Sequence, residues 1–313
     1  MALSNRNTKQ IKFTRIEGVP LIQPDPSLAW EAGGVFAPAV IHETTGWKML
    51  YRAYGSDKIS RLGFAESKDG GIWEKHKRPR VIPDSSNLEC SGVEDPRIVK
   101  IDNKYLITYT AYAAKPGFER TRIRILETTD FHEFRRISPS FSNGQRENDK
   151  DGVLFPEKIR NSYVMLHRVF PNIQISSSKD LKKWVGYKTV LKPTKNKWEL
   201  LKIGSGAPPI RTSIGWLLFY HGVSQDKQYS MGAVILDIHS PAKVLYRLPF
   251  SLLSPDVTYE KEGVVPNVVF GTSAIELVYN YYLYYGAADR VIAAALIDKS
   301  ELVKTLLQYP VIN

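Results

Sequence analysis

The sequence predicts an all-β fold, a five-bladed β-propeller with a short C-terminal helix and an N-terminal arm. Three patterns predict it: a glycine–proline motif that recurs five times, an aromatic-led strand after each copy, and a polar turn ending in aspartate after three of those strands. Units of four short strands repeated around an axis form a propeller, so five repeats predict five blades. A β-sandwich with chance internal similarity is the alternative, and the constant order of the motifs argues against it.

Each repeat begins with a glycine, then small or apolar residues, a proline and a strand-like run. The copies begin near positions 34, 92, 152, 204 and 263, and their prolines are Pro38, Pro96, Pro156, Pro208 and Pro266. The intervals of 58, 60, 52 and 58 residues predict one domain over residues 1–313. Because the innermost strands of a propeller line its channel, the residues beside these prolines should meet at one mouth.

The second and third strands of each unit are predicted by the other two patterns. The aromatic-led strands begin at Trp47, Tyr105, Tyr163, Trp216 and Tyr282. The polar turns contain Asp69, Asp130 and Asp180, each followed four residues later by an aromatic residue. An aspartate can bond its own backbone in a turn, which predicts a hairpin between the outer strands.

Little of the chain has helical periodicity. Residues 300–307 form the best candidate, with apolar positions 302, 303, 306 and 307, and they predict a helix that closes the ring or covers one face. The first thirteen residues are mostly polar and predict a loose arm.

The composition, 43% hydrophobic and 24% charged, is that of a folded protein. No apolar run reaches about 18 residues, and the first ten residues lack the apolar core of a secretion signal. The single cysteine, Cys90, excludes an intrachain disulfide. We therefore expect a cytoplasmic protein without membrane contact. A homo-oligomer formed through blade edges or the arm is a general expectation for propellers.

The net charge of +11 predicts an anionic partner. The lysines and arginines are spread along the chain, often beside acids, and no zinc-finger spacing or ribonucleoprotein motif occurs, so nucleic acid is disfavoured. A phosphate-bearing small molecule fits a basic surface equally well. The six histidines have no metal-site spacing, and no glycine-rich phosphate loop is present, so we expect no metal and no resident cofactor.

The predicted mouth collects cations from several repeats, with few acids to neutralise them. Cations crowded into a cleft repel one another unless an anion joins them, which is typical of a phosphate site. These residues are Arg52, Lys150, Arg168, Lys202 and His221.

The second repeat adds an acid pair, Glu94 and Asp95, with Arg97 as the expected partner of one of them. A structural ion pair is the alternative reading of these residues. Three tyrosines near the mouth, Tyr54, Tyr109 and Tyr112, are candidates for stacking on sugar faces, or are core residues.

Seven motifs in order resemble glycoside hydrolase family 130, from about Gly34 to Asp289. They are GVEDPR (92–97), LFPEK (154–158), MLHR (165–168), GSGAPP (204–209), YHG (220–222), VPN (265–267) and YGAAD (285–289). The resemblance implies a five-bladed propeller and an inverting β-mannoside phosphorylase, with hydrolases as the minority activity of the family. Two departures, Ala37 in place of a common Asn and Val169 in place of a frequent Pro, concern the sugar subsite.

The resemblance also implies roles for individual residues. Asp95 matches the proton donor, whose proton is thought to pass through a sugar hydroxyl. Arg168, Lys202, His221 and Tyr229 match positions around the phosphate, and Lys150 falls where many members have Arg or Lys. Arg52 and Asp289 match residues that hold the sugar at the cleavage point, and Glu94 and Arg97 are assigned to the substrate with them.

This residue set suits phosphorolysis, because phosphate is already an anionic nucleophile, whereas an inverting hydrolase needs a second carboxylate to activate water. The expected reaction converts a β-1,2- or β-1,4-linked manno-oligosaccharide and inorganic phosphate, the co-substrate, into α-mannose 1-phosphate and a shortened acceptor, or runs in reverse. Three alternatives stay open. They are a hydrolase with Asp151 or Glu157 as base, a β-mannosyltransferase that uses a nucleotide sugar such as GDP-mannose, and a propeller that only binds sugar or protein.

Overall fold

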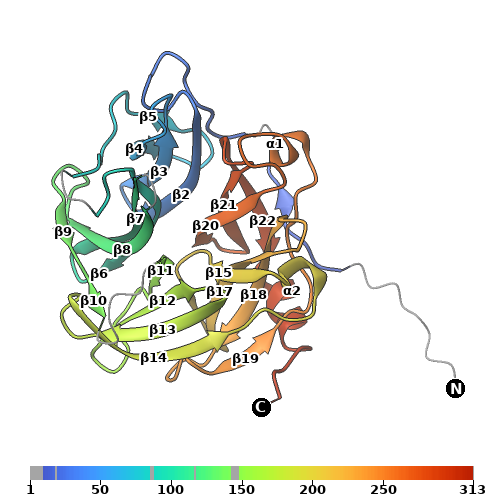
Figure 1. The fold of residues 1–313 in the computed structure, drawn as a ribbon. Coiled ribbons are helices and arrows are strands. Elements are labelled where there is room, and N and C mark those ends of the chain that lie inside the picture. Colours follow the sequence, from blue (N-terminus) through green and yellow to red (C-terminus); the bar gives the residue numbers. More distant parts are fainter. Residues whose placement is uncertain (1–9, 18–19, 85–87, 116–117, 142–147, 313) are drawn as a thin grey trace, which may run out of the picture.

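Five blades are arranged in a ring around one axis in the computed structural model, which describes residues 10–17, 20–84, 88–115, 118–141 and 148–312 (Figure 1). The first strands of neighbouring blades pack against one another at the centre. Blades 1 and 2 are joined into one sheet by the parallel pair Ser60 and Gly92. The predicted five-bladed propeller is confirmed.

Within each blade the main strands follow the chain outward from the axis, and the edge strands β1 and β10 are the exceptions. Blade 1 contains β2 (Gly34–Glu43), β3 (Gly46–Tyr54), β4 (Ser60–Ser67) and β5 (Glu74–Lys75). Blade 2 contains β6 (Gly92–Ile101), β7 (Lys104–Lys115), β8 (Phe118–Thr128) and β9 (Arg135–Ile137). Blade 3 contains β11 (Lys150–Leu154), β12 (Tyr163–Val169), β13 (Asn172–Ser178) and β14 (Lys183–Leu191), with β10 (Ser140–Phe141) at its edge.

Blade 4 has a divided first strand, because β15 and β16 both pair with β17. It contains β15 (Lys202–Ser205), β16 (Ile210–Thr212), β17 (Gly215–Val223), β18 (Tyr229–Leu236) and β19 (Val244–Arg247). Blade 5 contains β20 (Val269–Glu276), β21 (Asn280–Ala287) and β22 (Val291–Asp298). The helical elements are the 3-10 turn Lys197–Glu199, α1 (Thr258–Lys261) and α2 (Lys299–Leu306).

The N-terminal segment closes the ring. Strand β1 (Thr14–Arg15) pairs with β22, so the outermost strand of blade 5 comes from the opposite end of the chain. Ile11 and Phe13 are buried in the core between blades 4 and 5. The predicted loose arm is therefore wrong for residues 10–13, because these apolar side chains are buried on folding; residues 1–9 lie outside the described residues.

The aspartate turns are confirmed and continue further round the ring. Asp69, Asp130 and Asp180 each accept two backbone N–H bonds between the third and fourth strands of their blades. Asp237 does the same in blade 4, at 2.9 and 2.7 Å, without the following aromatic residue that the sequence pattern required. Asp298 instead caps α2, whose Leu302 and Leu306 are buried in the core, as the predicted helix requires.

The prolines do not occupy one position in the ring. Strands β2, β6 and β11 share a bulge at which one residue has a left-handed backbone: Ala37, Asp95 and Asp151, with φ of 46°, 50° and 55°. Pro38 and Pro96 follow the first two, whereas Gly152 follows the third, so Pro156 lies beyond the equivalent position. Blades 1 to 3 thus share the bulge, which re-aims a side chain toward the axis, rather than the proline.

Among the described residues, no helix is long and apolar enough to cross a membrane.

Candidate active site

One pocket takes side chains from all five blades. Its wall is formed by Phe36, Arg52, Asp95, Lys150, Asp151, Arg168, Lys202, His221, Tyr229, Val265, Val268, Phe270 and Asp289. Eight of the ten residues singled out from the sequence are among them. Glu94 and Arg97 are not, and both lie behind the wall.

Four of these residues form the carboxyl cluster: Arg52, Glu94, Asp95 and Asp289. Arg52 donates to Glu94 at 2.5 Å and to Asp95 at 3.0 Å, and its Nε donates to Ser60 at 2.9 Å. The expected ion pair of Arg97 with Glu94 or Asp95 is therefore wrong, because Arg52 of the neighbouring blade pairs with both acids.

Three carboxyl groups share this one arginine, and burial makes a full set of charges costly. Burial raises the pKa of Asp289 to about 6, and the charges of Asp95 and Glu94 act in the same direction against the pull of Arg52. Burial and the Asp95 charge also raise the pKa of Glu94. The carboxyl cluster therefore retains a proton at a pH at which exposed carboxyl groups have lost theirs.

Five residues form the cation cluster: Lys150, Arg168, Lys202, His221 and Tyr229. Burial, followed by the nearby Arg168 charge, lowers the pKa of Lys202. Burial lowers the pKa of His221 to about 3, so this residue is neutral near pH 7 and does not add the charge expected of it. The Lys202 ammonium lies 5.3 Å from the Tyr229 ring centroid, and that ring stacks on His221 at 5.8 Å.

Asp151 lies within the cation cluster, contrary to the expectation that few acids neutralise it. Its carboxylate lies 3.3 Å from Arg168, 3.8 Å from His221 and 3.7 Å from Arg97. These partners hold the pKa of Asp151 well below its usual range although it is fully buried. Among the residues that the structure describes, three buried nitrogens of this cluster have no hydrogen-bond partner, namely Arg168 Nε and both ring nitrogens of His221. These nitrogens of the cation cluster are therefore not used in hydrogen bonds, and the Asp151 carboxylate balances part of the positive charge of the cluster.

Arg97 is buried beneath the pocket and braces it. Its guanidinium donates to the backbone carbonyl of Asp95 at 2.7 Å and to the carbonyls of Gly206 and Ser205 at 3.2 and 3.3 Å. It thus ties the bulge that carries Asp95 to blade 4. The structure places it as a positioning residue rather than a lining residue.

The aromatic wall differs from the expected one. Tyr54, Tyr109 and Tyr112 do not line the pocket. Tyr109 is a core residue whose hydroxyl donates to the buried Glu89 at 2.7 Å. The lining aromatics besides Tyr229 are Phe36, which lies 4.8 Å from the Arg52 guanidinium, and Phe270, which packs on His221 at 4.9 Å.

Phe36 and Phe270, like Val265 and Val268, were missed in the sequence because no charged pattern marks them. The signal that could have found the two phenylalanines is their place on the inner strands, opposite Arg52 and Gly286. Within the described part of the chain, no group of three or more His, Cys, Asp or Glu side chains is arranged to hold a metal.

The sequence model of a glycoside hydrolase 130 family, described as beta-1,4-mannooligosaccharide phosphorylase, matches residues 15–308. A 1,2-beta-oligomannan phosphorylase of Thermoanaerobacter sp. (strain X514) is 39% identical over 93% of this chain and 99% of its own. A beta-1,2-mannobiose phosphorylase of the same organism is 37% identical over the same shares. A solved beta-1,2-mannobiose phosphorylase from Listeria innocua superposes with a TM-score of 0.83 at 25% identity, over 95% of this chain and 99% of its own.

Proposed function

The chain belongs to glycoside hydrolase family 130, and from that premise we propose that it cleaves β-1,2-linked manno-oligosaccharides with inorganic phosphate. It is a glycoside phosphorylase that acts on β-mannosides. Beyond this activity, we propose that the linkage cleaved is β-1,2. It is supported by the two relatives at 39% and 37% identity, both of which are named for β-1,2 substrates, although the family description itself names β-1,4.

The observation that carries the proposal is the division of one pocket into a carboxyl cluster and a cation cluster. Phosphate brings several acceptor oxygens and negative charge, which suit Arg168, Lys150 and Lys202. The carboxyl cluster then remains for the sugar and for proton transfer.

The proposed reaction is a single displacement with inversion. A phosphate oxygen attacks the anomeric carbon on the face opposite the glycosidic oxygen, and the bond between that carbon and that oxygen breaks. Asp95 gives its proton to the departing oxygen, directly or through a sugar hydroxyl. The products are α-mannose 1-phosphate and a shortened acceptor. We propose no further cofactor, because phosphate supplies the nucleophile.

Hydrolysis fits these residues less well. An inverting hydrolase needs a carboxylate that accepts a proton from water. Asp151 is held in its charged form by ion pairs with Arg97 and Arg168, which makes it a poor base. Glu157 pairs with Arg211 at the surface and does not line the pocket.

Product analysis tests the function and the linkage together. β-1,2- and β-1,4-mannobiose are each digested with and without inorganic phosphate, and the products are separated. We expect mannose 1-phosphate from the β-1,2 substrate, only in the presence of phosphate. Free mannose at equal rates in both conditions would establish a hydrolase. Turnover of the β-1,4 substrate alone would overturn the linkage. An inert enzyme would make GDP-mannose the next donor to test.

A further inference from the structure

A buried carboxylate lies behind the second strand in every blade. In four blades a glutamate with no exposed surface accepts the hydroxyl hydrogen of a buried tyrosine. The pairs are Tyr51–Glu31 at 3.0 Å, Tyr109–Glu89 at 2.7 Å, Tyr220–Glu199 at 2.7 Å and Tyr285–Glu260 at 2.8 Å.

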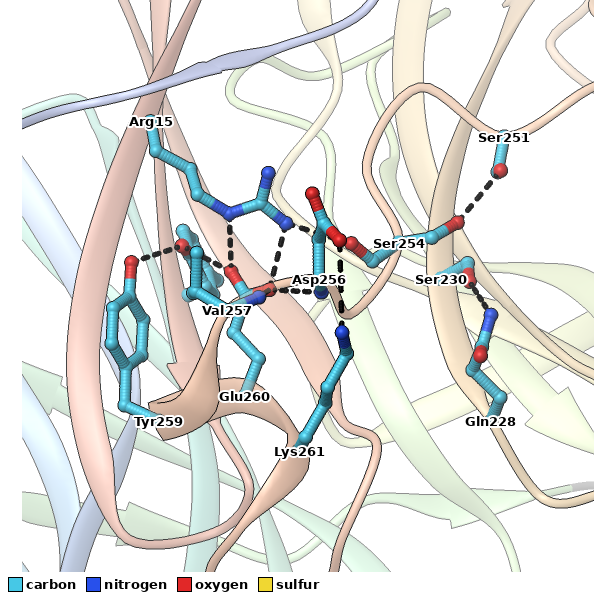
Figure 2. Close-up of polar contacts among 11 residues, drawn as sticks. Arg15, Gln228, Ser230, Ser251, Ser254, Asp256, Val257, Tyr259, Glu260 and Lys261 are labelled. Atoms are coloured by element: carbon cyan, nitrogen blue, oxygen red, sulfur yellow. Dashed lines mark hydrogen bonds and ion pairs between the residues drawn. The ribbon is translucent and has the colours of Figure 1, made fainter.

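Each of these four carboxylates also has a basic partner that compensates its charge. The partners are Lys75 for Glu31, Arg124 and Arg136 for Glu89, Arg247 for Glu199 and Arg15 for Glu260. Figure 2 shows the copy in blade 5, where Arg15 contacts Glu260. A buried charge requires such a partner, so the tyrosine serves as an additional, neutral donor.

Blade 3 is the exception. His167 takes the place of the tyrosine and Asp149 that of the glutamate, and the His167 Nδ1 and Asp149 Oδ2 atoms are 2.8 Å apart. Both residues are buried. Within the described residues no lysine or arginine forms an ion pair with Asp149, whose Oδ1 has no hydrogen-bond partner. Because a carboxylate only accepts, Nδ1 carries the proton of this bond.

The position of this exceptional pair connects it to the cation cluster. Asp149 directly precedes Lys150 in the chain, and His167 directly precedes Arg168. Lys150 and Arg168 are themselves cross-strand partners, after which the bulge interrupts the regular pairing up to Val153. Side chains alternate along a strand, so a residue facing the pocket has its neighbour on the opposite side. The bond from His167 to Asp149 thus joins β12 to the residue that directly precedes β11, next to both cations.

We propose that His167 and Asp149 are positioning residues for phosphate, which hold Lys150 and Arg168 at the spacing that the anion requires. This inference rests on the proposed function. Neither residue lines the pocket and both are buried, so we assign neither to direct contact with the substrate. The bond lies beside the Lys150–Arg168 pair, and its Asp149 end is on the side away from the bulge. Loss of a residue that orients metal ligands typically costs about 10- to 100-fold in affinity or activity, and we expect about tenfold for a pair that orients the cations of a phosphate site.

Two substitutions at one position separate positioning from packing. In His167→Asn the side-chain amide nitrogen stands near the place of Nδ1 and can still donate to Asp149. In His167→Leu the donor is lost. We expect His167→Leu to raise KM for phosphate and Kd for inorganic phosphate about tenfold, with KM for the mannoside nearly unchanged. His167→Asn should restore most of the phosphate affinity.

The repeat provides a matched control. Tyr109→Phe removes the equivalent bond to Glu89 in blade 2, where the following residue, Thr110, does not line the pocket. This variant should lose stability without a change in KM for phosphate. If His167→Leu does not fold, His167→Gln takes its place, because its longer side chain carries the amide near Nε2 rather than Nδ1.

The failures are distinguishable. If the wild-type protein binds no inorganic phosphate in a calorimetric titration and shows no phosphate-dependent turnover, the proposed function fails. If the wild-type protein binds phosphate and His167→Leu, or His167→Gln in its place, binds it equally well, the positioning role alone is overturned. Equal losses in the Leu and Asn variants would also overturn it, because they would show that packing and not the Nδ1 bond is what matters.

Discussion

Arg52, on the second strand of blade 1, donates a hydrogen bond of 3.0 Å to Asp95, which lies on the first strand of blade 2. Asp95 is at the bulge of its strand, with φ of 50°, and Arg97 holds its carbonyl from below. Asp95 is therefore fixed by arginines from two blades, since Arg52 holds its carboxylate and Arg97 holds its backbone carbonyl. A group that must transfer a proton at a defined place requires such fixation.

Asp95→Asn should reduce kcat by about 10²- to 10⁴-fold, the usual contribution of a general acid. Asparagine keeps the size of the side chain and tolerates the left-handed backbone, so the pocket should stay intact. Initial-rate kinetics in both directions, with mannoside binding measured by calorimetry, check this. A variant that keeps most of its activity would remove Asp95 from the role of acid.

The part of the site that could be predicted consists of residues whose place follows from the repeat. Arg52, Arg168 and His221 occupy equivalent positions on the second strands of their blades, so the count of five repeats already brings them to one pocket. Asp95 follows from its motif in the same way. Residues at equivalent positions of the repeat lie at equivalent places in their blades, and these assignments depended on that position alone.

The partners of those residues could not be predicted, because they depend on register and on contacts between blades. In the sequence motif Pro156 corresponds to Pro96, but in the structure Gly152 occupies the position of Pro96. This shift places Asp151 in the cation cluster. The arginine that pairs with the Asp95 carboxylate is Arg52 rather than Arg97, and this contact crosses a blade boundary. The buried carboxylates do have a signal in the sequence, because the interval from Glu31 to Tyr51 and the interval from Glu89 to Tyr109 are both 20 residues.

Gly204→Ala should damage the cation cluster. A Cβ atom at position 204 would lie 2.4 Å from Cε1 of His221 and 2.5 Å from Oδ2 of Asp151, both of which are buried. The clash must move at least one of them, at a cost of about 1–3 kcal/mol. We expect a lower Tm and a raised KM for phosphate.

Gly71→Ala is the matched control, since the nearest atom to its added Cβ would be 3.7 Å away. It should change neither Tm nor KM by a measurable amount. An unchanged KM for phosphate in Gly204→Ala would mean that His221 and Asp151 do not shape the phosphate subsite.

Lys202 should make kcat/KM for phosphate fall with rising pH, and the fall should begin at a lower pH than for an ordinary lysine. Burial and the Arg168 charge lower its pKa below the ordinary lysine value, so the folded protein loses this cation before an exposed lysine would lose its charge. kcat/KM for phosphate should therefore fall as the pH rises through the lowered pKa. Lys202→Arg keeps its charge at every accessible pH and should remove that fall. A fall that persists unchanged in the arginine variant would assign it to another group.

Asp289→Asn should stabilise the protein at neutral pH and not at pH 4. The folded-state pKa of Asp289 is about 6, above the ordinary aspartate value, so the folded state binds this proton more tightly than the unfolded chain does. Its contribution to stability is present at low pH and is lost as the pH rises toward and through 6, by about 3 kcal/mol at most. Asparagine has no such charge. Urea unfolding of both proteins at pH 4, 6 and 8 measures the difference, and a constant difference across that range would contradict the prediction.

Arg15→Met should weaken the contact of β1 with blade 5, which closes the ring. Arg15 lies on β1 and donates to Glu260 at 2.8 and 2.7 Å and to the Ser254 carbonyl at 2.7 Å, while Glu260 has no exposed surface (Figure 2). Methionine keeps much of the side-chain volume but leaves the buried carboxylate without its cation. Removing one partner of a buried ion pair costs about 3 kcal/mol or more.

Arg61→Met supplies the comparison, because Arg61 pairs with the more exposed Asp57 four residues away on the surface. A surface pair of this kind contributes at most about 1 kcal/mol. The Tm of Arg15→Met should therefore fall by several degrees more than that of Arg61→Met. Because β1 supplies the outermost strand of blade 5, hydrogen exchange of β22 should increase in Arg15→Met, whereas that of blade 2 should not. Equal effects of the two substitutions, or protection of β22 that does not change, would show that apolar burial of Ile11 and Phe13 alone closes the ring.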